Sequence, residues 1–210
     1  RALRDRFPTH PIVADMKIAD TGTIEVEMAA KAGASIVCIL GDADDVVIRE
    51  AVRAARLYGI RLMADLINAA DPPARAAHLE SMGIDIICAH VGIDQQMTGK
   101  DSLDLLSTLA GKVHIPVAVA GGIDAEGAAE AVRRGAGIVI VGGWIIRSAD
   151  VTASARKIRA AMDKPSGKAR EKRSGDDETR ALFLQVSGPN ITDAMHRKGA
   201  MAGVFSICGN

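Results

Sequence analysis

The sequence Pro11-Ile-Val-Ala-Asp-Met-Lys-Ile-Ala-Asp20 runs from a proline through apolar residues into two acids and a lysine. Side chains alternate between the two faces of a strand, so Asp15 and Lys17 share one face and Met16 lies on the other. Asp20 lies where the strand should have ended, so it need not share that face. A carboxylate beside an ammonium costs desolvation free energy, which favours a functional site; an ordinary ion pair at a strand tip is the alternative.

Apolar runs rich in Val and Ile recur along the chain, and they are continuous more than alternating. They span residues 12–16, 36–40, 61–67, 84–91, 117–120 and 138–142. This pattern is typical of strands buried on both faces, as in a parallel sheet. Alanine-rich segments with helical spacing separate the runs, at residues 22–32, 45–58, 71–82, 101–110, 124–134 and 150–162. The alternation predicts a series of βα units.

Helix boundaries are marked by glycines and by short polar residues. A glycine that closes a helix in the left-handed conformation is predicted just before four of the strands, at Gly33, Gly59, Gly83 and Gly135. Side chains suited to capping a helix N-terminus are Thr21, Asp44, Asp71, Asp101 and Asp124.

Two architectures accommodate six βα units: a doubly wound open sheet, and a (β/α)₈ TIM barrel with two units absent. No dinucleotide-binding fingerprint follows the first strand, and polar residues recur at the C-terminal ends of several strands. A barrel gathers these ends around one mouth. We therefore predict the α/β barrel, with six of its units in this chain.

Composition excludes several classes of function. Lys+Arg and Asp+Glu both number 26 in the 210 residues, so no overall field attracts nucleic acid or a membrane. Aromatic residues make up 2%, which argues against base-stacking platforms. The three cysteines have neither metal-ligand spacing nor the pattern of a disulfide framework, which favours the reducing cytoplasm. We expect no signal peptide and no membrane-spanning segment.

The chain is predicted to contain a barrel domain over residues 1–162, a linker over 163–178 and the beginning of a second domain over 179–210. The linker is charged and has no apolar face, which is typical of a solvated tether. A nucleic-acid contact by its basic run is the less favoured alternative. Because the chain opens without Met in a charged, helix-like segment, we expect it to begin partway through a larger protein.

Two glycine pairs end the last two predicted strands, Gly121-Gly122 and Gly142-Gly143. Barrels often bind phosphate at this place through backbone N–H groups, and glycine lets the phosphate approach closely. Either pair alone could simply form a tight turn. Two pairs on successive strands favour phosphate binding.

Two further polar residues end predicted strands. His90 shares a face with Ile86 and Cys88 and is either a satisfied core residue or a proton shuttle. Asp65 either takes part in the chemistry or orients Lys17 or a neighbouring strand end. The residues alone leave both alternatives open.

Asp15-Met-Lys-Ile-Ala-Asp20 matches the D-x-K-x-x-D signature, so the chain resembles the orotidine-monophosphate decarboxylase superfamily. Within it, residues 14–22, 90–96 and 119–123 are similar to the 3-hexulose-6-phosphate synthase family. The 3-keto-L-gulonate-6-phosphate decarboxylases are less similar, especially after His90. The resemblance covers residues 1–162. Residues 187–199 resemble the opening of a domain of the ribonuclease-activity-regulator / class II aldolase family.

The resemblance implies a homodimeric, ribulose-phosphate-binding barrel that uses Mg²⁺ and joins formaldehyde to D-ribulose 5-phosphate, reversibly, giving D-arabino-hex-3-ulose 6-phosphate. It implies Asp15 as a metal ligand, Lys17 at the reacting centre and Asp20 reaching into the partner's site. It also implies that His90 moves the C1 proton, and we group Asp65 with these catalytic candidates. The phosphate would bind at Gly121, Gly122, Gly142 and Gly143.

The family also uses an Asp and a metal-binding Glu on two strands that should precede Pro11. We therefore expect a fragment with two unpaired sheet edges and too few metal ligands. The decarboxylase, which would protonate a similar enediolate, is one alternative. A non-catalytic module that binds a sugar phosphate is another, although the intact set of Asp15, Lys17, Asp20 and His90 argues against it.

Overall fold

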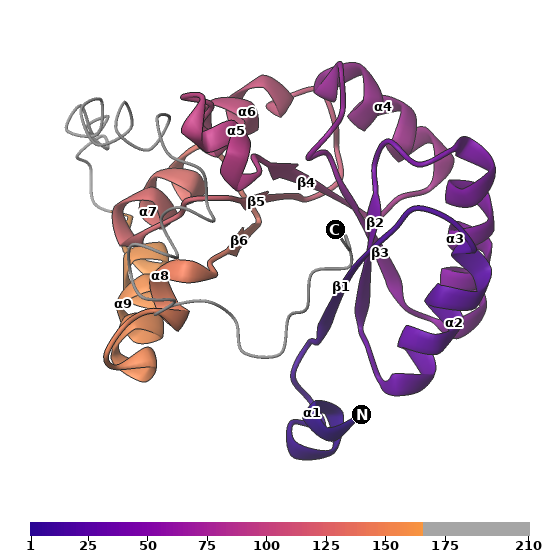
Figure 1. Ribbon diagram of the computed structural model, residues 1–210, viewed down its shortest axis with the longest axis horizontal. Helices are drawn as coiled ribbons and strands as arrows, with labels where there is room; N and C mark the ends of the chain where they lie inside the picture. The colour runs from indigo at the N-terminus through magenta and orange to yellow at the C-terminus, as the bar shows by residue number, and fades with distance from the viewer. Residues whose placement is uncertain (166–210) are drawn as a thin grey trace, which may run out of the picture. The chain divides into compact units, whose positions relative to one another are not determined.

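The computed structural model describes residues 1–165. Its helices and strands alternate along the chain (Figure 1). In chain order they are α1 (Ala2–Arg6), β1 (Val13–Ile18), α2 (Gly22–Ala32), β2 (Ile36–Leu40), α3 (Asp45–Tyr58), β3 (Arg61–Asp65), α4 (Pro72–Met82), β4 (Ile86–His90), α5 (Ile93–Met97), α6 (Ser102–Leu109), β5 (Val117–Ala120), α7 (Ala125–Arg133), β6 (Ile138–Ile140), α8 (Gly143–Ile146) and α9 (Val151–Asp163). The predicted linker beyond residue 165 and the predicted second domain lie outside the described residues.

The strands within residues 1–165 form one parallel sheet in the order β1-β2-β3-β4-β5-β6. A doubly wound sheet reverses its strand order at a switch point, and this sheet does not. It curls, with the helices on its outer side (Figure 1). This confirms the predicted barrel-type fold and excludes the doubly wound open sheet. β1 and β6 are the two edges of the described sheet, as expected from six units.

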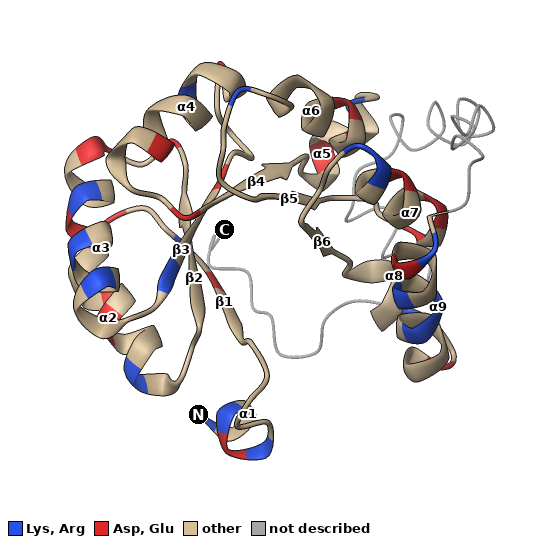
Figure 2. Ribbon diagram, turned by 180° about the vertical axis from the view of Figure 1, so that it is seen from behind, with Lys and Arg blue, Asp and Glu red and all other residues tan. Residues whose placement is uncertain are grey.

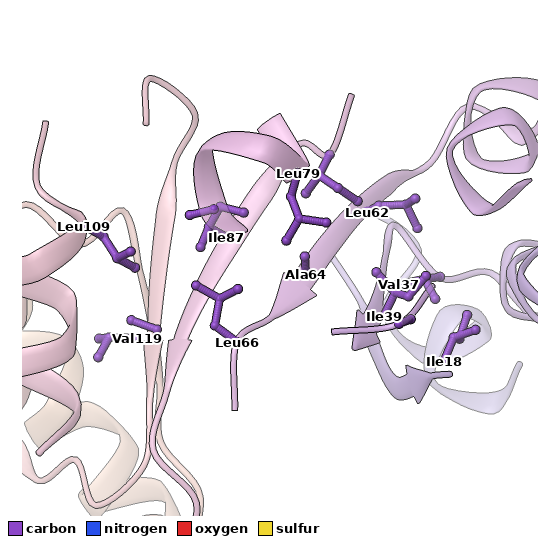
Figure 3. Close-up of a cluster of buried hydrophobic side chains, with 14 of the residues drawn as sticks. Ile18, Val37, Ile39, Leu62, Ala64, Leu66, Leu79, Ile87, Leu109 and Val119 are labelled. Carbon is purple, nitrogen blue, oxygen red and sulfur yellow. The ribbon is translucent and has the colours of Figure 1, made fainter. Parts of the chain in front are cut away.

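The main core lies between the outer face of the sheet and the helices, where Ile39, Leu62 and Ile87 are fully buried (Figure 3). Burial of one such side chain stabilises the fold by about 1.5–3 kcal/mol. The alternate residues of the strands form a second, smaller cluster: Ile36, Cys38, Met63, Ile86, Cys88, Ala118 and Ala120. Burial of both faces explains why the apolar runs in the sequence are continuous.

The predicted helix boundaries are confirmed with one exception. Gly33, Gly59 and Gly83 are left-handed C-caps, and Gly135 has a φ of 91° just past α7. The four predicted aspartate caps each accept a hydrogen bond from a backbone N–H in the first turn: Asp44, Asp71, Asp101 and Asp124.

Thr21 is the N-cap of α2 as predicted, but it does not cap the helix through its side chain. Thr21 is left-handed, with a φ of 50°, and its side chain makes no capping hydrogen bond. The backbone N–H of Thr21 instead donates to Asp20 Oδ1 at 2.7 Å. The chain therefore turns sharply between β1 and α2, which the pattern of residue types did not indicate.

Charged side chains of both signs lie mainly on the outer helices and loops, and the strands are largely free of them (Figure 2). This distribution fits a formal net charge of zero, because neither sign dominates. No helix in the described part of the chain is long and apolar enough to cross a membrane.

Candidate active site

The first strand ends in an irregularity that aims Lys17 across the sheet. Asp15 pairs with Cys38 and Ile18 pairs with the next residue of β2, so two residues of β1 have no partner there. Lys17 has a φ of 47°, a left-handed conformation that costs a non-glycine residue about 1–2 kcal/mol. Its Nζ donates to Asp15 Oδ1 at 3.0 Å and to Asp65 Oδ2 at 2.6 Å. Asp15 and Lys17 meet as predicted, but through a bulge.

Asp65, at the end of β3, connects two candidate residues from other strands. Its side chain is 4% exposed and accepts hydrogen bonds from Lys17 Nζ at 2.6 Å and from the backbone N–H of Ile67 at 3.0 Å. His90 Nδ1 lies 2.8 Å from its Oδ2. Burial raises the pKa of Asp65, but the hydrogen bonds from His90 and Lys17 outweigh burial and hold this pKa below its usual value. Asp65 is therefore a carboxylate at neutral pH.

Lys17 is held in its charged form. Partial burial lowers the pKa of its ammonium, but the hydrogen bonds to Asp65 and Asp15 outweigh burial and raise this pKa above its ordinary value. The side chain is 35% exposed, so the ammonium faces both the carboxylates and the solvent-accessible side. Lys17 can therefore stabilise a developing negative charge, but it is a poor base at neutral pH.

His90, at the end of β4, is oriented by Asp65. A carboxylate only accepts hydrogen bonds, so Nδ1 of His90 carries a proton. In a neutral ring the other nitrogen, Nε2, then has a free lone pair. His90 lines the same cavity as Lys17, which places that lone pair where it can take a proton from a bound molecule.

A cavity of about 840 Å³ runs along the strands and includes their C-terminal ends. Asp15, Lys17, Asp65 and His90 line it together with both predicted phosphate turns, Gly121-Gly122 and Gly142-Gly143. Small-molecule sites are of this size. The tertiary structure thus brings the predicted ionisable groups and the predicted phosphate turns to one place.

The Gly121-Gly122 turn requires glycine. Gly121 has a φ of 105°, and a Cβ there would lie 2.2 Å from the backbone oxygen of Val91. Gln96 packs over the turn: its Nε2 donates to Val91 O at 2.8 Å, and its Oε1 lies 2.6 Å from where a Cβ of Gly122 would be. The turn is therefore bare backbone that a ligand can approach.

Asp20 is the one predicted site residue that the structure does not bring to this cavity. It is exposed, and it is absent from the described residues that line the cavity. Its carboxylate accepts the backbone N–H of Thr21.

Sequence reasoning assigned no role to Gln96, Trp144 or Arg147, which also line the cavity. Trp144 and Arg147 follow the second glycine pair directly, and that proximity was the available signal. Cys38 and Cys88 are buried core thiols, as predicted; burial raises the pKa of Cys38 to about 12.

Asp15 supplies one carboxylate suited to a metal ion, and both of its oxygens contact Lys17. Within residues 1–165, no group of three His, Cys, Asp or Glu side chains is placed to hold a metal. Mg²⁺ prefers about six oxygen ligands, often one or two carboxylates together with water and substrate oxygens. The described residues therefore do not form a complete protein site for such an ion by themselves.

A family model described as orotidine 5'-phosphate decarboxylase / HUMPS matches residues 1–158. The chain belongs to this family. The curved parallel sheet is the fold of this family member, and the cavity described above is its candidate site.

Relatives and solved structures of the family include several 3-hexulose-6-phosphate synthases. The protein of that name from Bacillus subtilis is 36% identical over 160 residues, which cover 76% of each chain. One from Staphylococcus epidermidis is 39% identical over 162 residues, covering 77% of each. The crystal structure of the Salmonella typhimurium protein matches with a TM-score of 0.74 and 35% identity, covering 79% of each chain.

A 3-keto-L-gulonate-6-phosphate decarboxylase from Vibrio cholerae matches with a TM-score of 0.64 and 24% identity, covering 77% of this chain and 76% of that one. At this level of identity the match shows the family fold and nothing about the reaction.

Proposed function

We propose that the protein is an aldehyde-lyase, a 3-hexulose-6-phosphate synthase. It would condense formaldehyde with D-ribulose 5-phosphate to D-arabino-hex-3-ulose 6-phosphate and catalyse the reverse reaction. The observation that carries the proposal is the chain of contacts Asp15–Lys17–Asp65–His90, which shares one cavity with two glycine turns. Relatives of that name at 36–39% identity support the proposal.

The first steps follow from the chain's own groups. Backbone N–H groups of the Gly-Gly turns hold the phosphate, and the sugar's reacting end extends toward His90. His90 Nε2 takes a proton from C1, which is acidified by the neighbouring C2 carbonyl. The enediolate that forms carries negative charge, and the ammonium of Lys17 stabilises it where it develops.

Carbon–carbon bond formation completes the reaction. The electron pair at C1 attacks the formaldehyde carbon, and the formaldehyde oxygen gains the negative charge. The imidazolium of His90 returns its proton to that oxygen, so protons and electrons balance. Asp65 acts through Lys17 and His90 as a positioning residue, since its described contacts are with those two side chains and with the backbone of Ile67.

Mg²⁺ belongs to this proposal, with Asp15 as one of its ligands. When bound, the ion would add positive charge next to the enediolate oxygens.

A homodimer in which Asp20 reaches the partner's cavity is also part of the proposal. Asp20 is exposed just before α2, and α2 and α3 carry exposed apolar side chains, Ile24, Met28 and Val46. Analytical ultracentrifugation tests the dimer directly. A cytoplasmic location is proposed on the strength of the two free, buried cysteines, Cys38 and Cys88.

The test is formaldehyde consumption by the protein with ribulose 5-phosphate and Mg²⁺, with and without a chelator. We expect consumption that needs the metal. Release of CO₂ from 3-keto-L-gulonate 6-phosphate without formaldehyde consumption would replace the synthase by the decarboxylase. Binding of ribulose 5-phosphate with neither reaction would indicate a non-catalytic sugar-phosphate-binding module.

A further inference from the structure

Arg147 lies one turn beyond the Gly142-Gly143 pair, and its side chain folds back over Gly143. Its Nε, Cζ and Nη2 atoms each lie 3.4 Å from the position that a Cβ would take at Gly143. Equal distances to these atoms place the guanidinium flat over the glycine. Arg147 lines the same cavity as Lys17 and His90.

The guanidinium of Arg147 has no counter-ion in the part of the chain that the structure describes, and its side chain makes no hydrogen bond there. Lys17, the other permanent cation of the cavity, pairs with both Asp15 and Asp65. The donors of Arg147 are therefore available to a ligand. Their planar fork matches the oxygens of a phosphate group, which accept two parallel N–H bonds.

The charges of the protein groups that line the cavity favour a cation at this end for an anionic ligand. Besides Arg147, the charged side chains that residues 1–165 contribute to the lining are the carboxylates of Asp15 and Asp65 and the ammonium of Lys17. A phosphate monoester carries close to two negative charges at neutral pH. Without Arg147 it would enter a cavity of its own sign, where charges are screened less than in bulk water.

The backbone that carries Arg147 is fixed. The N–H of Arg147 donates to Gly143 O at 3.0 Å, and the hydroxyl of Ser154 on α9 donates to Trp144 O at 3.2 Å. The first contact closes the end of α8 and the second holds α8 against α9, so little backbone freedom is lost when the side chain meets a ligand.

We propose that Arg147 recognises the phosphate group of the sugar phosphate, together with the backbone of the Gly142-Gly143 turn. The proposal rests on the proposed function and deepens it, because it names the residue that selects a phosphorylated sugar over the free sugar.

The test measures binding rather than turnover. Isothermal titration of the full chain with inorganic phosphate and with ribulose 5-phosphate gives the dissociation constants. Trp144, the one tryptophan of the chain, lines the cavity and gives a second, fluorescent signal. Arg147→Gln and Arg147→Lys are compared with Arg156→Gln, which removes the same charge from the exposed side of α9, outside the cavity lining.

We expect Arg147→Gln to weaken the binding of both ligands by about ten- to a hundredfold, the effect of losing hydrogen bonds between charged groups. Arg147→Lys keeps the charge but not the fork, so its loss is smaller. Arg156→Gln binds both ligands as the wild type does. Circular dichroism verifies folding, and the lysine variant carries the test if the glutamine variant does not fold.

The outcomes separate this inference from the proposed reaction. Wild-type affinity in Arg147→Gln, or an equal loss in Arg156→Gln, refutes the role of Arg147 and leaves the lyase activity untouched. A selective loss in Arg147→Gln, in a chain that shows no lyase activity, upholds phosphate recognition and refutes only the reaction. Failure of the wild type to bind either ligand overturns both.

Discussion

Replacement of Asp65 by asparagine tests the centre of the site with almost no change of shape. The carboxylate of Asp65 holds Lys17 Nζ at 2.6 Å and His90 Nδ1 at 2.8 Å. An amide can present an N–H to the ring, which favours the tautomer with the proton on Nε2 and so removes the base. The same substitution disables the histidine of a serine-protease triad for this reason.

The size of the effect follows from the two contacts. A hydrogen bond to a charged group contributes about 1.5–3 kcal/mol, and both contacts act on one reacting centre. Their loss would raise the barrier by about 3–6 kcal/mol, which slows proton removal by about 10²–10⁴-fold. We expect the free energy of unfolding to change by less than about 2 kcal/mol, because the amide fills the same space and removes the cost of burying a charge.

The assay follows the exchange of the C1 proton of ribulose 5-phosphate in deuterated water by NMR, without formaldehyde. Exchange isolates the step assigned to His90 from carbon–carbon bond formation. Asp42→Asn is the matched control, since Asp42 is an exposed carboxylate after β2 that does not line the cavity. Exchange by Asp65→Asn at the rate of the control would refute the positioning role of Asp65.

Three further predictions follow from the same geometry. Lys17→Ala should abolish formaldehyde consumption while the urea midpoint stays close to that of the wild type, because the Lys17 side chain is partly exposed and lies at the mouth of the cavity. Turnover at the wild-type rate would exclude Lys17 from the reacting centre. Gly121→Ala should lower the urea midpoint and weaken phosphate binding, since a Cβ would lie 2.2 Å from Val91 O; an unchanged midpoint and affinity would contradict the tight turn. The pKa of Asp65 is held low in the folded state, so the unfolded chain binds its proton first as the pH falls. The stability that Asp65 contributes should therefore be complete above about pH 4 and should be lost as the pH falls through the lower folded pKa. Urea titrations at several pH values should find this loss of stability to be smaller in Asp65→Asn.

Residue types and spacing determined most of the architecture. Glycine is the residue that best closes a helix in the left-handed conformation, so Gly33 and Gly83 marked helix ends that the structure confirms. Asp44 and Asp71 marked helix starts for a similarly local reason, since a short carboxylate reaches the free N–H groups of the first turn. The short helix α5 was not predicted, because five residues are too few to establish a helical period.

The tertiary structure alone decided how the site is assembled. Asp65 lies 48 residues from Lys17 and 25 from His90, and only the curvature of the sheet and the register of β1 to β4 bring the three side chains into contact. The left-handed Lys17 is a strained conformation that no local preference of lysine favours; its ion pairs with two carboxylates help to stabilise it. Local preferences are encoded within a few residues, whereas long-range contacts depend on the whole chain having folded.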